Sequence, residues 1–386
     1  MKPARVGEGI IGNKIVEPVF TFNGNMLLNR GTIVNSKVLK KLMGHNINFV
    51  YVIEDIKKDI IPINTLEEKR IARAESTIKK VFLDTLHNEK LGVKTLIPEG
   101  NLILVEKIID SILKDLSDSK DILFTLSDLI DTDEYTYKHS INVTVLTILT
   151  ANSLNYKKND IKNIALGALL HDIGKIMVKD NLIAKPGKLT EDERNEVMKH
   201  SEFGFQIVDS IEKLSFTTKQ IIRLHHEKLD GSGYPLGLKG IEIPEYVRIV
   251  TICDMFDAMS TNRVYRDKMS IYKVFDILNG ESIYRIDTEI YKAVITNICV
   301  FPPGSGVILT DDRMGIVANY NRFNPTRPRV RVINTNSNLL KVEIVNLEKE
   351  LKLFIKDKWD VDEYLEEIRR RKIRNKKILK TNSYIS

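Results

Sequence analysis

Five of the seven histidines in this 386-residue chain fall between residues 139 and 226. Each lies on or beside an apolar stretch with helical spacing, and one of them is followed at once by an aspartate. The histidines are His139, His171, His200, His225 and His226, and the aspartate is Asp172. A single histidine on an apolar helical face is usually a core residue with a satisfied hydrogen bond. Five in succession, beside a carboxylate whose burial must be compensated, instead indicate metal ligands.

The chemistry of these six side chains favours a divalent metal centre. Imidazole nitrogen and carboxylate oxygen together suit iron, manganese or zinc, whereas the near absence of cysteine argues against a closed structural zinc site. Six ligands exceed one coordination shell and suit two ions that share Asp172. Two ions about 4 Å apart lower the pKa of a bound water and stabilise the attacking and leaving oxygens of a phosphoryl group. The pattern therefore favours phosphoester hydrolysis.

A further carboxylate is needed to complete the ligand set, and the segment TICDMFDAM offers two. Asp254 and Asp257 are three residues apart and share one face of a predicted helix. Asp257 has the alternative role of a helix cap or ion-pair partner.

The elements that position these residues are predicted to be mostly helices. Apolar residues recur at helical spacing from residue 66 to about 300, with breakers such as KPGK and DGSGYPLGLKG between the helices. Before them, VFTF-NGN-MLL predicts a hairpin, VLKKLMGHN a short helix closed at Gly44, and NFVYVI a strand. After them, GVILT, GIVANY, RVRVI and LKVEIV predict strands. We expect five segments: a mixed α/β module (1–62), a helical connection (63–124), a catalytic bundle (125–300), a β appendage (301–355) and a basic helical tail (356–386).

Composition places the chain among ordinary globular proteins. Hydrophobic residues make up 42% of it, no apolar run reaches the length of a membrane span, and the N-terminus lacks a signal-peptide core. With Cys253 and Cys299 as the only cysteines, a cytoplasmic location is expected. Much of the net charge of +7 lies in EEIRRRKIRNKKILK at 366–380, which indicates a solvated helix more than a nucleic-acid site.

The order and spacing of these residues resemble the HD-GYP family, a branch of the HD-domain metal phosphohydrolases. The resemblance covers about residues 125–300. It rests on His139, the HDIGK segment at 171–175, His200, the HHE segment at 225–227, the DGSGYP segment at 230–235, and DMFDAM at 254–259.

The resemblance implies an all-α bundle that hydrolyses cyclic di-GMP to pGpG, and onward to GMP, by attack of a hydroxide bridging two metal ions. Iron or manganese is the expected metal. One ion would be held by His139, His171, Asp172 and Asp254. The second would be held by His200, His225 and His226, with Asp172 shared.

Further roles follow from the same resemblance. Lys175 would stabilise charge near the scissile phosphate or protonate the leaving oxygen, although a salt bridge to Asp172 is the alternative. Arg263 and Arg266 match positions that contact phosphate and guanine. The GYP loop would shape the mouth of the site and contact protein partners; its residues are Asp230, Gly231, Gly233, Tyr234 and Pro235.

Two positions depart from the family pattern. Tyr135 replaces a glutamate that binds a third metal in some members, so two metals are expected, with Asp133 and Glu134 keeping the question open. Cys253 stands where alanine is common and is expected to be a small core residue.

The sequence leaves other functions open. The domain could sense a cyclic dinucleotide or dock partners without hydrolysis, or it could hydrolyse cyclic GMP-AMP. A homodimer is left open, as is the activating signal.

Overall fold

The computed structural model confirms a mainly α-helical chain with small β-containing parts. It describes residues 4–360, apart from 8–9, 16–17, 22–25, 51, 54–59, 61–67, 94–95, 119–122, 126–134, 184, 186, 262–268 and 335–340. Contacts divide the chain into two compact units. Residues 63–302 and 320–328 form the helical unit, and residues 1–62, 303–319 and 329–386 form the other. Each is described by itself.

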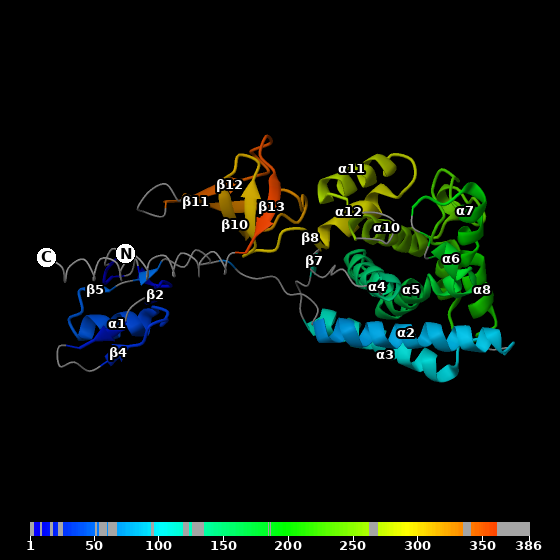
Figure 1. The fold of residues 1–386 in the computed structure, drawn as a ribbon, viewed down its shortest axis with the longest axis horizontal. Coiled ribbons are helices and arrows are strands. Elements are labelled where there is room, and N and C mark those ends of the chain that lie inside the picture. Colours follow the sequence, from blue (N-terminus) through cyan, green and yellow to red (C-terminus); the bar gives the residue numbers. More distant parts are fainter. Residues whose placement is uncertain are drawn as a thin grey trace. The chain divides into compact units, whose positions relative to one another are not determined.

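The centre of the helical unit consists of α4 (Tyr135–Ser153), α5 (Lys158–Leu170), α9 (Phe216–Leu224) and α10 (Glu245–Ser260). Helix α4 packs on α5 and α10, and α5 packs on α9 (Figure 1). In α5, every residue from Ile164 to Leu170 is buried, and α4 is buried almost continuously from Lys138 to Ala151. A helix that is buried on all sides cannot show a clean amphipathic stripe, and these two helices therefore form the interior of the bundle.

Two long helices, α2 (Glu68–Lys90) and α3 (Glu99–Asp118), pack against α4 and α5 respectively. The remaining elements surround the core or connect it. They are β7 (Phe124–Thr125), η3 (Ile173–Met177), α6 (Asp180–Ile183), α7 (Glu191–Met198), α8 (His200–Asp209), η4 (Gly240–Glu242), α11 (Ile271–Glu281), α12 (Thr288–Thr296) and β8 (Ile298–Cys299). Strands β7 and β8 pair in parallel.

Side-chain caps fix where several of these helices begin. Thr190 and Glu193 form a reciprocal capping box at the start of α7, Ser215 caps α9, and Asp287 caps α12. Each oxygen accepts a backbone N–H that the first helical turn would otherwise leave unpaired.

The N-terminal part is a small mixed module. Its strands pair as β1 (Ala4–Arg5) with β5 (Phe49–Val50), β2 (Lys14–Ile15) with β6 (Val52–Ile53), and β3 (Val19–Phe20) with β4 (Met26–Leu28). The antiparallel β3–β4 pair confirms the strands of the predicted hairpin, whose turn at 22–25 lies outside the described residues.

The predicted short helix and its end at Gly44 are confirmed by α1 (Ser36–Gly44). The left-handed residue after the helix is Asn46, with φ of +53°. The Ile47 N–H donates to the Leu42 carbonyl at 3.0 Å, which closes the helix. Asparagine tolerates this backbone region better than most residues, so it suits this position after the helix.

The C-terminal strands form one antiparallel sheet in the order β12-β11-β10-β9-β13. The strands are β9 (Gly306–Leu309), β10 (Met314–Asn319), β11 (Arg329–Asn334), β12 (Lys341–Asn346) and β13 (Ile355–Trp359). The expected boundary at residue 355 is wrong, because β13 continues to Trp359, whose indole N–H lies 3.0 Å from the Val307 carbonyl oxygen. The expected helix at 366–380 lies outside the described residues.

Among the residues that the structure describes, none of the helices has the length and apolar character needed to cross a bilayer.

One close approach of backbones determines where the HDIGK segment lies. A Cβ atom added to Gly174 of η3 would stand 1.9 Å from the His200 carbonyl oxygen and 2.3 Å from the Gly204 nitrogen. Both neighbours are backbone atoms of α8, so neither can rotate away. Only glycine at position 174 lets η3 lie this close to α8.

We expect Gly174→Ala to destabilise the chain by at least about 2 kcal/mol, because overpacked backbone must separate to admit the methyl group. The measurement is the urea midpoint of the helical unit. Gly280→Ala on α11 is the matched control: a Cβ there meets nothing within 4 Å, so little change is expected. Equal midpoints for the two variants would contradict this interpretation of the η3–α8 contact.

Candidate metal centre

The structure brings all seven expected metal ligands together from five helical segments. His139 lies on α4, His171 and Asp172 follow α5, and His200 begins α8. His225 and His226 follow α9, and Asp254 lies on α10. Their ligand atoms form three overlapping groups, each within 4.8 Å: His139–His171–Asp254, His171–Asp172–His225, and His200–His225–His226.

Asp172 stands between the two ends of this cluster. Its Oδ2 lies 3.3 Å from His171 Nε2 and 3.8 Å from His139 Nε2, whereas its Oδ1 lies 3.5 Å from His200 Nε2. One oxygen of the carboxylate therefore faces His139 and His171, and the other faces His200. A carboxylate shared by two cations requires this arrangement.

Three of the histidines are oriented by the same kind of local hydrogen bond. The Nδ1 atoms of His171, His200 and His225 lie 2.7, 2.8 and 3.0 Å from the carbonyl oxygens of Ala168, Val197 and Ile222. Each carbonyl belongs to the last turn of a helix, where no intrahelical donor remains, and each lies three residues before its histidine. Because a carbonyl can only accept, Nδ1 carries the proton and the neutral ring directs the lone pair of Nε2 into the site.

These tautomers place acceptor atoms opposite one another. His200 Nε2 lies 3.3 Å from His225 Nε2 and 3.2 Å from His226 Nε2. The buried Nε2 of His171 has no hydrogen-bond partner in the structure. Facing lone pairs and an orphaned buried nitrogen are unfavourable unless a cation lies among them, so these residues fit a metal centre.

Asp257 orients a ligand and is not one of the candidate ligands. Its Oδ2 lies 2.6 Å from His139 Nδ1, and its Oδ1 accepts a hydrogen bond from Asn142 Nδ2 at 2.9 Å. The pairing role considered for Asp257 is the one the structure shows. Asn142 was missed, although its position three residues after His139, on the same face of α4, was the available signal.

Burial and charge set the protonation of the cluster. Burial lowers the pKa of His200 to about 4 and that of His226 to about 3, and it lowers the pKa of His225 well below its ordinary value. These rings are neutral at pH 7, as ligands must be. Burial opposes a charged His139, but hydrogen bonds to Asp254 and Asp257 raise its pKa to about 9.

Both ligand carboxylates are ionised. Burial alone would raise the pKa of each, but interactions with neighbouring side chains reverse this effect. Nearby His171 and Lys175 hold the pKa of Asp172 well below its usual range. A hydrogen bond from His139 does the same for Asp254.

Lys175 lies beside the shared carboxylate, with its Nζ 2.6 Å from Asp172 Oδ2. The salt bridge considered as the alternative role is therefore present. The lysine side chain is 24% exposed, against 2% for Asp172, so it connects the buried carboxylate with the solvent-accessible surface.

The DGSGYP loop lies against the histidine pair. The Tyr234 ring packs on the His226 ring with centroids 4.7 Å apart and an angle of 31°, and a cis peptide joins Tyr234 to Pro235. Asp230 Oδ1 accepts hydrogen bonds from the Ser232 N–H and hydroxyl at 2.9 and 2.6 Å. Gly231 has φ of +80°, and its glycine identity suits that backbone region.

Some expected residues lie elsewhere. Arg263 and Arg266 fall in 262–268, outside the described residues, as do Asp133 and Glu134. Tyr135 is the first residue of α4. Cys253 is fully buried, burial raises the pKa of its thiol to about 12, and it behaves as the core residue expected.

Sequence comparisons agree with this site. Residues 125–290 match the model of the HD domain, and residues 306–367 match the KOW domain associated with HD domain. A cyclic di-GMP phosphodiesterase of Pseudomonas aeruginosa is 32% identical over 59% of this chain and 54% of its own length. The cyclic di-GMP phosphodiesterase response regulator RpfG of Xanthomonas campestris pv. campestris is 41% identical over 31% of this chain and 32% of its own.

A third relative is named for a different substrate. The 3'3'-cGAMP-specific phosphodiesterase 3 of Vibrio cholerae is 43% identical over 36% of this chain and 30% of its own length. The chain thus spans about half or less of the length of these curated relatives.

Asp257→Asn should weaken metal binding about 10–100-fold, because His139 loses the carboxylate that raises its basicity and fixes its ring. Titration of the metal-free chain with Mn(II) measures this change. Asp276→Asn, an exposed aspartate on α11, is the control and should bind as the wild type does. Unchanged affinity in Asp257→Asn would show that the contact with His139 has no influence on the ligand.

The metal-free chain should lose stability as the pH falls below 6.5. The folded pKa of His200 is about 4, against an ordinary value of 6.5, so below 6.5 the unfolded chain binds a proton that the folded chain excludes. The loss approaches about 1.4 kcal/mol per pH unit for this residue, and its contribution is fully present above pH 6.5. Urea unfolding in EDTA at pH 7, 6 and 5 measures the slope. His200→Gln should have a shallower slope; parallel slopes would refute the assignment.

Proposed function

Residues 125–290 belong to the HD domain family, and from this premise we propose that the chain is a metal-dependent phosphodiesterase that hydrolyses cyclic di-GMP to pGpG or GMP. The observation that carries the proposal is the position of Asp172, whose two oxygens face two separate groups of histidines. A single-ion site would leave one of these groups without a function.

Seven side chains would hold two divalent ions. The mixed nitrogen and oxygen donors suit iron, manganese or zinc, and the family resemblance implies iron or manganese. One ion would lie with His139, His171, Asp172 and Asp254, and the other with His200, His225, His226 and Asp172. When bound, such a pair supplies a nucleophile at neutral pH and neutralises phosphate charge.

The protein residues have complementary tasks in this proposal. The carbonyl groups of Ala168, Val197 and Ile222 keep three imidazoles in the ligand tautomer, and Asp257 does the same for His139. Lys175, which is partly exposed and lies beside Asp172, would stabilise charge on the phosphate or protonate the leaving oxygen. Arg263 and Arg266 are proposed as contacts to phosphate and guanine, a task that suits the paired donors of a guanidinium.

A second substrate is supported by one comparison. A relative 43% identical to this chain over 139 residues is named as specific for 3'3'-cGAMP. The metal cluster acts on a phosphodiester whatever the attached base, so 3'3'-cGAMP is the alternative substrate.

The test is a product assay on chain reconstituted anaerobically with Fe(II) or Mn(II), using cyclic di-GMP and 3'3'-cGAMP. The wild type should release linear dinucleotide or mononucleotide, and the double variant His171→Ala, Asp172→Ala should fall to the background rate with its fold retained. His87→Ala, an exposed histidine on α2, should keep full activity. Turnover by the double variant would refute the assigned centre, and binding without product by the wild type would favour a sensor.

A further inference from the structure

Glu227, next to the second histidine of the pair, is a buried carboxylate with an unusual set of partners. It is 2% exposed, and its Oε1 accepts hydrogen bonds from the Leu236 and Gly237 N–H groups at 2.7 and 3.1 Å. Its Oε2 accepts from the Leu238 N–H at 3.0 Å. Three successive backbone donors of the GYP loop therefore converge on one carboxylate.

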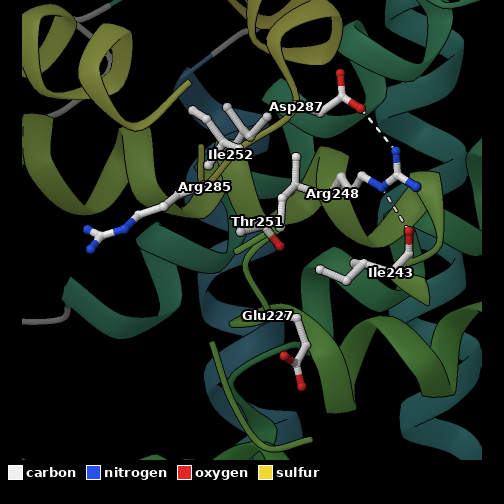
Figure 2. Close-up of a pocket in the computed structure, with 9 residues that line it drawn as sticks. Glu227, Ile243, Arg248, Thr251, Ile252, Arg285 and Asp287 are labelled. Atoms are coloured by element: carbon white, nitrogen blue, oxygen red, sulfur yellow. Dashed lines mark hydrogen bonds and ion pairs between the residues drawn. The ribbon is translucent and has the colours of Figure 1, made fainter. Parts of the chain in front are cut away.

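Among the residues that the structure describes, none forms an ion pair with this carboxylate. Glu227 lines a pocket together with Arg248 and Arg285, but both guanidinium groups are engaged elsewhere. Arg248 pairs with Asp287 at 3.0 Å, and Arg285 pairs with Asp230 at 3.1 Å. Figure 2 shows the Arg285 guanidinium directed away from Glu227, and the Arg248 group joined to Asp287 and to the Ile243 carbonyl.

A buried carboxylate is costly unless its oxygens are satisfied, and here only loop N–H groups satisfy them. Losing the loop conformation would leave the charge unpaired. The three hydrogen bonds thus hold Leu236–Leu238 in one conformation relative to the histidine pair.

The same loop places an aromatic ring on a metal ligand. Tyr234 packs on His226, and its N–H donates to the His226 carbonyl at 3.3 Å. Gly233 leaves no space for a side chain, since a Cβ there would stand 2.4 Å from the Lys228 nitrogen and 2.5 Å from the Glu227 Cα. His226 lacks the carbonyl partner that orients His171, His200 and His225. Its ring packs between the His225 ring, with centroids 4.1 Å apart, and the Tyr234 ring, so Tyr234 is the contact outside the candidate ligands that restricts its rotation.

We propose that Glu227 is a positioning residue: by binding the Leu236–Leu238 backbone it keeps the Tyr234 ring against His226, and so sets the affinity of the His200–His225–His226 group for its metal ion. The inference deepens the proposed function, because it rests on that group being a metal site. Glu227 touches neither metal nor substrate and acts through Tyr234.

A double-mutant cycle read by Mn(II) titration tests this dependence. Glu227→Gln and Tyr234→Ala should each weaken one of the two Mn(II) sites about 10-fold, and the combined variant also about 10-fold, because both changes remove the same restraint. Tyr234→Phe keeps the ring and should restore the wild-type affinity. An additive loss of about 100-fold, or unchanged affinity in Glu227→Gln, would overturn the proposal.

The matched control is Glu242→Gln. Glu242 also accepts a backbone N–H of this loop, from Lys239 at 2.8 Å, but it is exposed and follows the Tyr234 segment. It should leave both Mn(II) affinities unchanged. A loss equal to that of Glu227→Gln would mean that any disturbance of the loop suffices, and would refute a specific role.

A measurement on the wild type avoids any folding defect in the variants. Because coupling between sites is reciprocal, Mn(II) binding should slow hydrogen exchange at the Leu236, Gly237 and Leu238 amides. Unchanged exchange at these amides on saturation would overturn the proposal. Neither readout uses turnover, so a chain that binds two ions without hydrolysing cyclic dinucleotides would sink the proposed function alone.

Discussion

The structure depends on the burial of one ionised carboxylate. Asp172 is 1% exposed, and burying its charge would be strongly unfavourable without compensation. Lys175 and His139, whose pKa is raised to about 9, supply positive charge near Oδ2, but His200, which faces Oδ1, is held neutral by burial and by its Nδ1–H bond. The inward lone pair of a neutral imidazole adds to the negative potential at Oδ1 instead of relieving it. A cation bound between Oδ1 and the imidazoles would resolve this conflict.

The bundle meets this constraint with helix ends. His171, His200 and His225 each take their orientation from a carbonyl in the last turn of α5, α7 and α9, where the helix leaves carbonyls unpaired. The same geometry that ends a helix therefore fixes the tautomer of a ligand. His139 lies inside α4, where carbonyls are already used, and it obtains the equivalent partner from the side chain of Asp257 on α10. A backbone carbonyl in three cases and a carboxylate in the fourth thus have the same effect, which is to accept a hydrogen bond from the Nδ1–H of the histidine.

How far the sequence could predict this site depends on the kind of residue. The five histidines and the HDIGK segment could be recognised from the sequence because few types of side chain bind metals. So many of them in one region are hard to explain as ordinary core residues. Asp254 and Asp257 share a face of α10, and only the position of His139 and Asn142 on the facing helix distinguishes the ligand from its orienting neighbour. Glu227 belongs to the HHE segment that carries the resemblance, but no role could be predicted for it, because its partners are backbone N–H groups nine to eleven residues later, which carry no side-chain signature.

The boundaries show the same limit. Strand β13 extends to Trp359, whose indole N–H donates to the carbonyl oxygens of Val307 and Gly315. The charged residues of this segment gave no indication of this tertiary contact in the sequence. Helix α1 does end at the predicted Gly44, but the left-handed residue that follows it is Asn46, two positions later. For β13, a long-range contact decided a strand end that side-chain periodicity left undetermined.

The two ends of the cluster are electrostatically unequal. The His139–His171 end contains a carboxylate of its own, Asp254, and a second carboxylate, Asp257, behind His139. The other end has three imidazoles and shares only the Oδ1 side of Asp172. A cation at the first end is therefore attracted by more negative charge, whereas one at the second depends on how well three neutral rings are aligned. Ring alignment is a packing property, and at His226 part of that packing comes from Tyr234 of the DGSGYP loop, whose following residues are hydrogen-bonded to buried Glu227.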